Sequence, residues 1–158
     1  MKVRSVQFDN RRQSFHVTVG SRVLELPYAA MDRTRGRLKV VRAFPDPEMG
    51  YEGFAFELDT GEIDGVHVDN VLLVNGDPRA VRENTLHNLT AASLDALAES
   101  GVSKRSLARR LGTSMSQLAR LLDPTNRTKS IEQMMSLLRA LGRDVEVVVK
   151  KRSPVAAA

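Results

Sequence analysis

The chain contains neither cysteine nor tryptophan. Without cysteine it can form no disulfide bond, no thiolate metal site and no cysteine nucleophile. Aromatic residues make up only 4% of the chain, so its core must consist mainly of Val, Leu, Ile, Ala and Met. No apolar run approaches the roughly 20 residues that span a membrane, and residues 1–5 lead into no signal-peptide segment. We therefore expect a cytoplasmic protein.

Motifs for metal binding and catalysis are also missing. The three histidines, His16, His67 and His87, have no partners at metal-ligand spacing. The acidic residues between positions 46 and 69 lack the spacing of a calcium loop. The sequence has no Gly-rich phosphate loop and no convincing Ser-His-Asp set. We expect no cofactor, no metal and no enzymatic activity, and a hydrolase using Asp59 or Asp64 is the least favoured alternative.

The net charge of +5 conceals a strong partition along the chain. Residues 1–42 carry ten Lys and Arg against three Asp and Glu, a balance of +7. Residues 43–78 carry nine Asp and Glu and no basic residue, a balance of −9. Residues 103–129 carry seven basic residues against Asp123 alone, a balance of +6. Each block is either a solvated face or a surface for a different partner.

The first half of the chain has the periodicity of β-strands. In residues 15–19 and 54–58 apolar side chains alternate with others, which places them on one face of a sheet. Gly20-Ser21 suits a tight hairpin turn, and Asp59-Thr60-Gly61 suits a longer one. Residues 46–53 follow a Pro-Asp-Pro break and are predicted to form a loop. We predict a small, mostly antiparallel sheet domain over residues 1–78.

After Thr90 the spacing of apolar residues becomes that of helices. Leu94 and Leu97 are predicted to share the buried face of a first helix. Three further helices are expected because cap and stop signals agree with the apolar spacing. The predicted N-caps are Ser103, Ser114 and Ser130, and the predicted stops are Gly101, Gly112, Asp123-Pro124 and Gly142.

These patterns give the chain an α+β organisation. A small N-terminal antiparallel β-sheet domain (1–78) precedes a linker or short helix (79–88). A four-helix domain with a terminal strand (89–150) follows, and residues 151–158 are predicted to be a disordered tail. In the terminal strand Val145, Val147 and Val149 alternate with other residues. A lone strand needs a partner, either the N-terminal sheet or a second copy of the chain.

Residues 106–122 resemble a helix-turn-helix of the phage-repressor (XRE) class. Ala108 stands where two helices cross closely, and Gly112 permits the tight turn between them. Leu118 would anchor the second helix to the core, and Ser114 would cap it. This resemblance implies that the second helix enters the major groove of DNA.

The resemblance extends over about a third of the chain. Residues 99–149 are similar to the C-terminal domain of HicB-type antitoxins. The matching features are Gly101-Val102-Ser103-Lys104, Leu107-Ala108-Arg109-Arg110-Leu111-Gly112, Arg120-Leu121-Leu122-Asp123, and Leu138-Arg139-Ala140-Leu141-Gly142-Arg143 with its Val-rich strand. The N-terminal half does not follow the HicB pattern of a partial RNase H-like domain.

This resemblance implies a repressor dimer that binds an operator, often that of its own toxin–antitoxin operon. Met115, Ser116 and Arg120 would then face base edges. Phosphate contacts would come from the remaining predicted DNA-binding residues, Lys104, Ser114, Gln117, Asn126, Arg127 and Lys129. Val145, Val147 and Val149 would join two subunits. The chain would be a nucleoid-associated, sequence-specific repressor and plausibly an antitoxin.

A second hypothesis is a protein-capture module that neutralises a toxin and binds DNA only secondarily. The −9 block would mimic nucleic acid and dock a basic protein. Substitutions in the acidic sheet would then abolish partner binding, whereas Arg120→Ala would have little effect.

Overall fold

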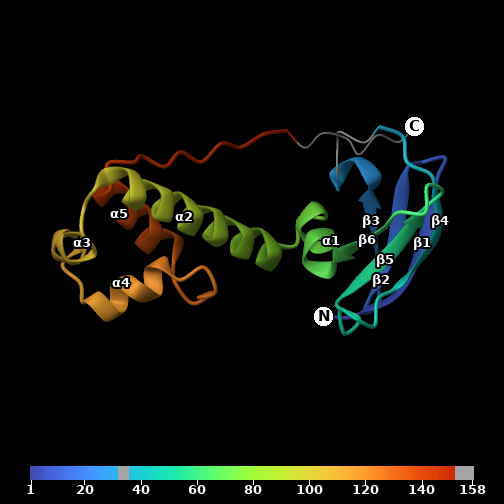
Figure 1. Ribbon diagram of the computed structural model, residues 1–158, viewed down its shortest axis with the longest axis horizontal. Coiled ribbons are helices and arrows are strands. Elements are labelled where there is room, and N and C mark those ends of the chain that lie inside the picture. The colour runs from blue at the N-terminus through green and yellow to red at the C-terminus, as the bar shows by residue number, and fades with distance from the viewer. Residues whose placement is uncertain (32–35, 152–158) are drawn as a thin grey trace. The chain divides into compact units, whose positions relative to one another are not determined.

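The computed structural model describes residues 1–31 and 36–151, and the chain divides into two compact units, residues 1–80 and 81–150. Figure 1 labels the helices and strands. The described residues form two three-stranded antiparallel sheets and five α-helices, so the predicted α+β class is confirmed. The predicted disordered tail, residues 151–158, lies outside the described residues apart from Lys151.

Two sheets replace the single sheet predicted for the N-terminal unit. The first has the order β1-β2-β3 and consists of β1 (Val3–Asp9), β2 (Ser14–Val19) and β3 (Arg22–Pro27). A 3-10 turn, η1 (Tyr28–Ala30), follows it. The second has the order β4-β5-β6 and consists of β4 (Val40–Pro45), β5 (Gly53–Leu58) and β6 (Ile63–His67). The predicted turn at Gly61 is confirmed, with φ at +85°.

Both sheets contribute their inner faces to one core. Phe15 of β2 lies at its centre, and its ring centroid is 4.9 Å from that of Phe54 and 5.2 Å from that of Phe56. Tyr28 closes the same cluster at 4.7 Å from Phe15. These tilted and edge-on arrangements are the favourable geometries for aromatic pairs. All seven Phe and Tyr residues fall within the first 80 positions, so the helical unit has no aromatic side chain.

Two side-chain amides connect the β1–β2 turn to the start of β4. Asn10 donates from Nδ2 to the carbonyl of Val40 at 2.8 Å and accepts the amide of Val40 on Oδ1 at 2.9 Å. Gln13 makes the same pair of bonds with Leu38, at 2.8 and 2.9 Å. A carboxamide offers one donor and one acceptor in the manner of a peptide group. These amides therefore bond main-chain groups of residues 38 and 40, and β1 lies beside β4 without pairing with it.

The strand periodicity predicted for the first half of the chain ends at His67. Residues 68–74 form helix α1 (Val68–Val74), in which Val68, Val71 and Leu72 are buried. Positions 68, 71 and 72 have the i, i+3, i+4 spacing of one helix face. His67 caps this helix, since its Nδ1 accepts the amide of Asp69 at 3.2 Å.

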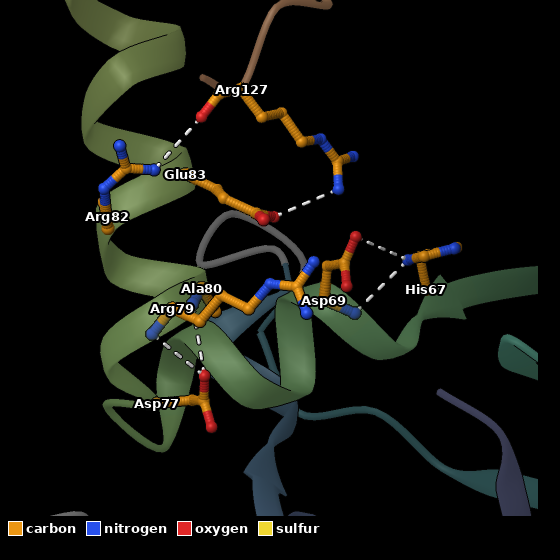
Figure 2. A network of polar contacts seen from close by, with 8 residues as sticks. All are labelled: His67, Asp69, Asp77, Arg79, Ala80, Arg82, Glu83 and Arg127. Atoms are coloured by element: carbon orange, nitrogen blue, oxygen red, sulfur yellow. Dashed lines mark hydrogen bonds and ion pairs between the residues drawn. The ribbon is translucent and has the colours of Figure 1, made fainter. Parts of the chain in front are cut away.

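The second unit contains four helices in its described residues: α2 (Pro78–Ser100), α3 (Lys104–Leu111), α4 (Met115–Leu122) and α5 (Ile131–Ala140). The interval 79–88, predicted as a linker or short helix, is the first part of α2. Asp77 supports this start, because its Oδ1 accepts the backbone amides of Arg79 and Ala80 at 3.2 Å each (Figure 2).

The buried face of α2 differs from the one predicted. Leu97 packs partly buried against the core as predicted, but Leu94 is 37% exposed, and the fully buried positions are Leu86, Thr90, Ser93 and Ala96. The Thr90 hydroxyl donates to the Leu86 carbonyl and the Ser93 hydroxyl to the Leu89 carbonyl, both at 2.7 Å. Each hydroxyl is satisfied within its own helix, so it can lie in the core without a partner on a neighbouring element.

The predicted C-terminal strand is not formed in the single chain. Residues 143–151 have no regular secondary structure, and the side chains of Val147 and Val149 are 82% and 91% exposed. A strand requires main-chain hydrogen bonds to a neighbour, and no strand among the described residues pairs with this segment.

The amide bridge at Asn10 generates the first prediction. Asn10→Ala removes both bonds to Val40 and the acceptor of the Tyr28 hydroxyl, which is bound at 3.1 Å. We expect the free energy of unfolding of the N-terminal unit to fall by about 2–3 kcal/mol. Tyr28 and Tyr51 are the only tyrosines and there is no Trp, so tyrosine fluorescence during urea unfolding reports this unit alone.

Gln7→Ala is the matched control, because Gln7 is an exposed residue of β1 and should change stability by no more than about 0.5 kcal/mol. Equal stability of the Asn10→Ala and Gln7→Ala variants would contradict the structural role of the amide bridge.

Candidate nucleic-acid interface

Helices α3 and α4 are joined by a short turn whose ends are capped. Ser103 Oγ accepts the amide of Ser106 at 3.1 Å, and Ser114 Oγ accepts the amide of Gln117 at 3.1 Å. Gly112 ends α3 with φ at +63°, a left-handed conformation that glycine adopts without a side-chain clash. These predicted caps and the glycine stop are confirmed, and they fix where α4 begins.

Helix α4 is anchored on one side and open on the other. Leu118, Leu121 and Leu122 are buried in the core of the helical unit. Arg120 is exposed, and Met115 at the first helical position is 48% exposed.

The remaining predicted residues at the start of α4 differ in their exposure and in their structural roles. Ser116 is exposed and lies one turn before Arg120, so the two share a face of the helix. Gln117 is half-buried, and the hydroxyl of Ser114 is already engaged as the cap. A thioether, a hydroxyl and a guanidinium therefore project from the open face of α4.

Exposed cations accompany this face. Lys104, the first residue of α3, is exposed, as are Arg105 and Arg109 on the same helix. Within residues 1–31 and 36–151, the side chains of these three residues and of Arg120 have no ion-pair partner. Charges free of internal partners can contact an external anion without first breaking a bond in the protein.

Lys129 does not lie at this surface, and its prediction as a phosphate contact was wrong. Its side chain is buried, with 3% of the residue exposed. The Nζ atom donates to the carbonyls of Leu121 at 2.9 Å, in the last turn of α4, and of its C-cap Asp123 at 2.7 Å. Burial lowers the pKa of Lys129, while the nearby Asp123 opposes that change. The negative end of the helix dipole stabilises a cation at the C-terminus of a helix.

Asn126 is likewise part of the scaffold. Its Nδ2 donates to the Arg120 carbonyl at 3.0 Å. Its Oδ1 accepts two hydrogen bonds from Thr128, one from the backbone amide at 3.0 Å and one from the side-chain hydroxyl at 2.7 Å. Asp123 organises the loop start in the same manner. Hydrogen bonds from Thr125 hold the pKa of this carboxyl below its usual value.

Arg127 projects from the same loop but is paired. Its guanidinium lies 3.2 Å from Glu83 Oε2, and Figure 2 shows Arg127 reaching this carboxylate on α2. Arg82 then donates to the carbonyls of Arg127 at 3.2 Å and Lys129 at 3.1 Å. The start of α2 therefore holds the loop in place. Sequence reasoning missed Arg82, since it lies 45 positions before its acceptor.

Of the nine predicted DNA-binding residues, four form the open surface. These are Lys104, Met115, Ser116 and Arg120. Ser114, Asn126 and Lys129 hold the scaffold, Gln117 is half-buried and Arg127 is paired with Glu83. Arg105 and Arg109, which the sequence left unassigned, extend the exposed positive charge along α3.

Residues 1–31 and 36–151 contain neither a cluster of metal-ligating side chains nor a membrane-spanning helix. Among the described residues, no group of three or more His, Asp and Glu side chains could hold a metal ion. No helix in this part of the chain has the length and apolar character needed to cross a membrane.

Comparisons with family models, curated proteins and solved structures find no match to this chain.

A substitution of Lys129 tests whether this residue stabilises the helical unit or contacts DNA. Lys129→Met leaves the carbonyls of Leu121 and Asp123 without their buried donor. We expect the free energy of unfolding of the helical unit to fall by about 1–3 kcal/mol. Urea unfolding followed by circular dichroism at 222 nm measures it.

The matched control is Lys104→Met, which removes an exposed lysine with no ion-pair partner in the described structure. It should change stability by at most about 0.5 kcal/mol. A Lys129→Met protein that is as stable as wild type but binds DNA less tightly would restore the original surface assignment.

Proposed function

We propose that this chain is a sequence-specific DNA-binding transcriptional repressor. The observation that supports it best is the exposed face of α4, a capped helix whose opposite face is buried. Such a helix can enter the major groove of DNA as a rigid body. Helices α3 and α4 would form the helix-turn-helix of the phage-repressor class that residues 106–122 resemble.

Each open residue has a defined role in this proposal. The Arg120 guanidinium can donate two hydrogen bonds to O6 and N7 of a guanine. The exposed Met115 side chain can pack on a thymine methyl group, and Ser116 can bond to a base edge. Lys104 at the start of α3 contacts a phosphate. Arg105 and Arg109 add sequence-independent attraction to the backbone.

The loop after α4 supports this surface indirectly. Lys129 and Asn126 bind carbonyls at the end of α4, and Arg82 binds the loop from α2. Arg127 lies at the exposed rim and can exchange its contact with Glu83 for a phosphate. The Arg127 side chain is 62% exposed and that of Glu83 is 21% exposed, so the exchange would leave a partly buried carboxylate without this partner.

The biological setting rests on the resemblance to HicB-type antitoxins. It favours an operator upstream of the chain's own gene and the role of an autoregulating antitoxin. The alternative of a protein-capture module remains the main competitor, because residues 43–78 carry nine acidic residues and no basic ones.

We further propose that the repressor is a homodimer. One unit of this size buries too little surface on DNA for high specificity, and two half-sites one helical turn apart overcome this limit. The half-buried Val145 and the exposed Val147 and Val149 would pair with the same segment of a second chain, giving each strand the neighbour that it lacks. Antiparallel pairing about Val147 sets Asp144 opposite Lys150 of the other copy, which brings opposite charges together.

The DNA prediction concerns Arg120. Wild-type protein should prefer duplex DNA from upstream of its own gene to a scrambled duplex of equal length. Arg120→Ala should reduce this preference by about 1–3 kcal/mol, because it removes a bidentate base contact. Fluorescence anisotropy at two salt concentrations measures both affinities.

Arg4→Ala is the control, since Arg4 is an exposed arginine of β1 outside the proposed surface. Equal binding to both duplexes that disappears in salt would indicate phosphate attraction alone. That result would rule out autoregulation at this operator and favour protein capture.

The dimer prediction concerns the C-terminal segment. The full chain should have the mass of a dimer in size-exclusion chromatography with light scattering, and a chain ending at Gly142 should be monomeric. Val147→Asp should weaken the dimer because it places two carboxylates opposite each other at the two-fold axis. Glu146→Gln on the opposite strand face is the control. A dimeric truncated chain would exclude this segment as the interface.

A further inference from the structure

The N-terminal unit contains a second positively charged surface, composed of Arg11, Arg12, Arg37 and Lys39. The four residues come from two separate segments, 9–13 and 37–40. The Asn10 and Gln13 amides hold these segments together through their bonds to Val40 and Leu38. Arg37 adds a bond from its guanidinium to the Asn10 carbonyl at 3.2 Å. The surface is therefore built by the fold and not by adjacency in sequence alone.

All four side chains are available to solvent. Arg11, Arg12, Arg37 and Lys39 are exposed, and none has a carboxylate partner among the described residues. Two carboxylates lie close in the chain or the fold. Asp9 bonds the amides of Arg11 at 2.9 Å and Arg12 at 3.1 Å, and the Asp59 amide donates to the Lys39 carbonyl at 3.0 Å.

The Asp9 carboxylate is committed to the turn. It accepts backbone amides and leaves both guanidinium groups without an ion pair. The surface therefore keeps an excess of positive charge even when Asp9 and Asp59 are counted. This excess is local, because residues 1–80 as a whole carry 11 basic and 12 acidic residues, a balance of −1.

The composition of the surface indicates its partner. Three of the four cations are arginines, whose planar guanidinium groups match the geometry of phosphate oxygens. The segments 9–13 and 37–40 contain no exposed apolar side chain, since Leu38 is half-buried and Val40 is buried. Protein interfaces generally have an apolar core with charged residues depleted there. A surface of exposed arginines without such a core favours a nucleic-acid backbone over a protein.

We infer that Arg11, Arg12, Arg37 and Lys39 form a second nucleic-acid contact, which binds the phosphate backbone of duplex DNA without reading bases. This inference rests on the proposed function in choosing duplex DNA as the partner. It adds a contact outside the helical unit, so the N-terminal unit contributes affinity while α4 contributes specificity.

The test uses the full chain and a scrambled duplex, so that base recognition by α4 does not enter. Arg11→Gln with Arg12→Gln removes two charges from the surface. Each phosphate contact contributes about −0.9 to the slope of log affinity against log salt concentration. The double variant should make this slope shallower by about 1–2 and weaken binding several-fold at low salt. Lys2→Gln with Arg4→Gln removes two exposed charges at the opposite end of β1 and should leave the slope unchanged.

Three outcomes would overturn the inference. One is an unchanged slope for the Arg11/Arg12 variant, with tyrosine fluorescence showing the unit folded. Another is an equal change in both double variants, which would reflect net charge alone. The third is that the Arg11/Arg12 variant loses more affinity for fluorescent polyglutamate than for the duplex. That result would indicate that the partner of this surface is an acidic protein. Because these measurements use scrambled DNA, they remain decisive even if Arg120→Ala leaves operator preference intact and the proposed repressor function fails.

Discussion

The buried ammonium group of Lys129 is the interaction on which the candidate surface depends. It binds the carbonyls of Leu121 and Asp123 at the end of α4, and it thereby connects that helix to the loop that follows. Placing a cation in a protein interior is unfavourable unless polar groups replace its water. Two carbonyls and the dipole of α4 provide this replacement here. The same loop is held from outside by Arg82, so its path is fixed from both sides.

In the N-terminal unit, neutral side-chain amides bond main-chain groups in a similar way. Asn10 and Gln13 bond both main-chain groups of Val40 and Leu38, where the two sheets approach. Gln13 adopts a left-handed backbone conformation with φ at +54°, which is uncommon for a residue other than glycine. In both units, polar side chains form hydrogen bonds with main-chain amides and carbonyls that are not paired within regular secondary structure.

Local signals in the sequence were sufficient to locate much of this architecture. Ser103, Ser114 and Gly112 could be assigned because capping depends on residues three or four positions apart. Lys129 and Asn126 could not be assigned correctly, because a lysine or asparagine in a basic loop has the same sequence signature whether it is solvated or buried. The two sheets were also missed, since the amide bridges that connect them join residues 25 and 30 positions apart. The C-terminal valines have the pattern of a strand, but a pattern supplies no hydrogen-bonding neighbour.

The buried face of α2 has a consequence for how this protein can diverge. Thr90 and Ser93 return their hydroxyl bonds to their own helix. Exchange of Thr90 for valine or of Ser93 for alanine leaves no polar group on a neighbouring helix without a partner. Such replacements are nearly neutral in shape, and homologous chains can acquire them independently at each position. The hydropathy of this helix can therefore rise at these two positions while its packing is preserved.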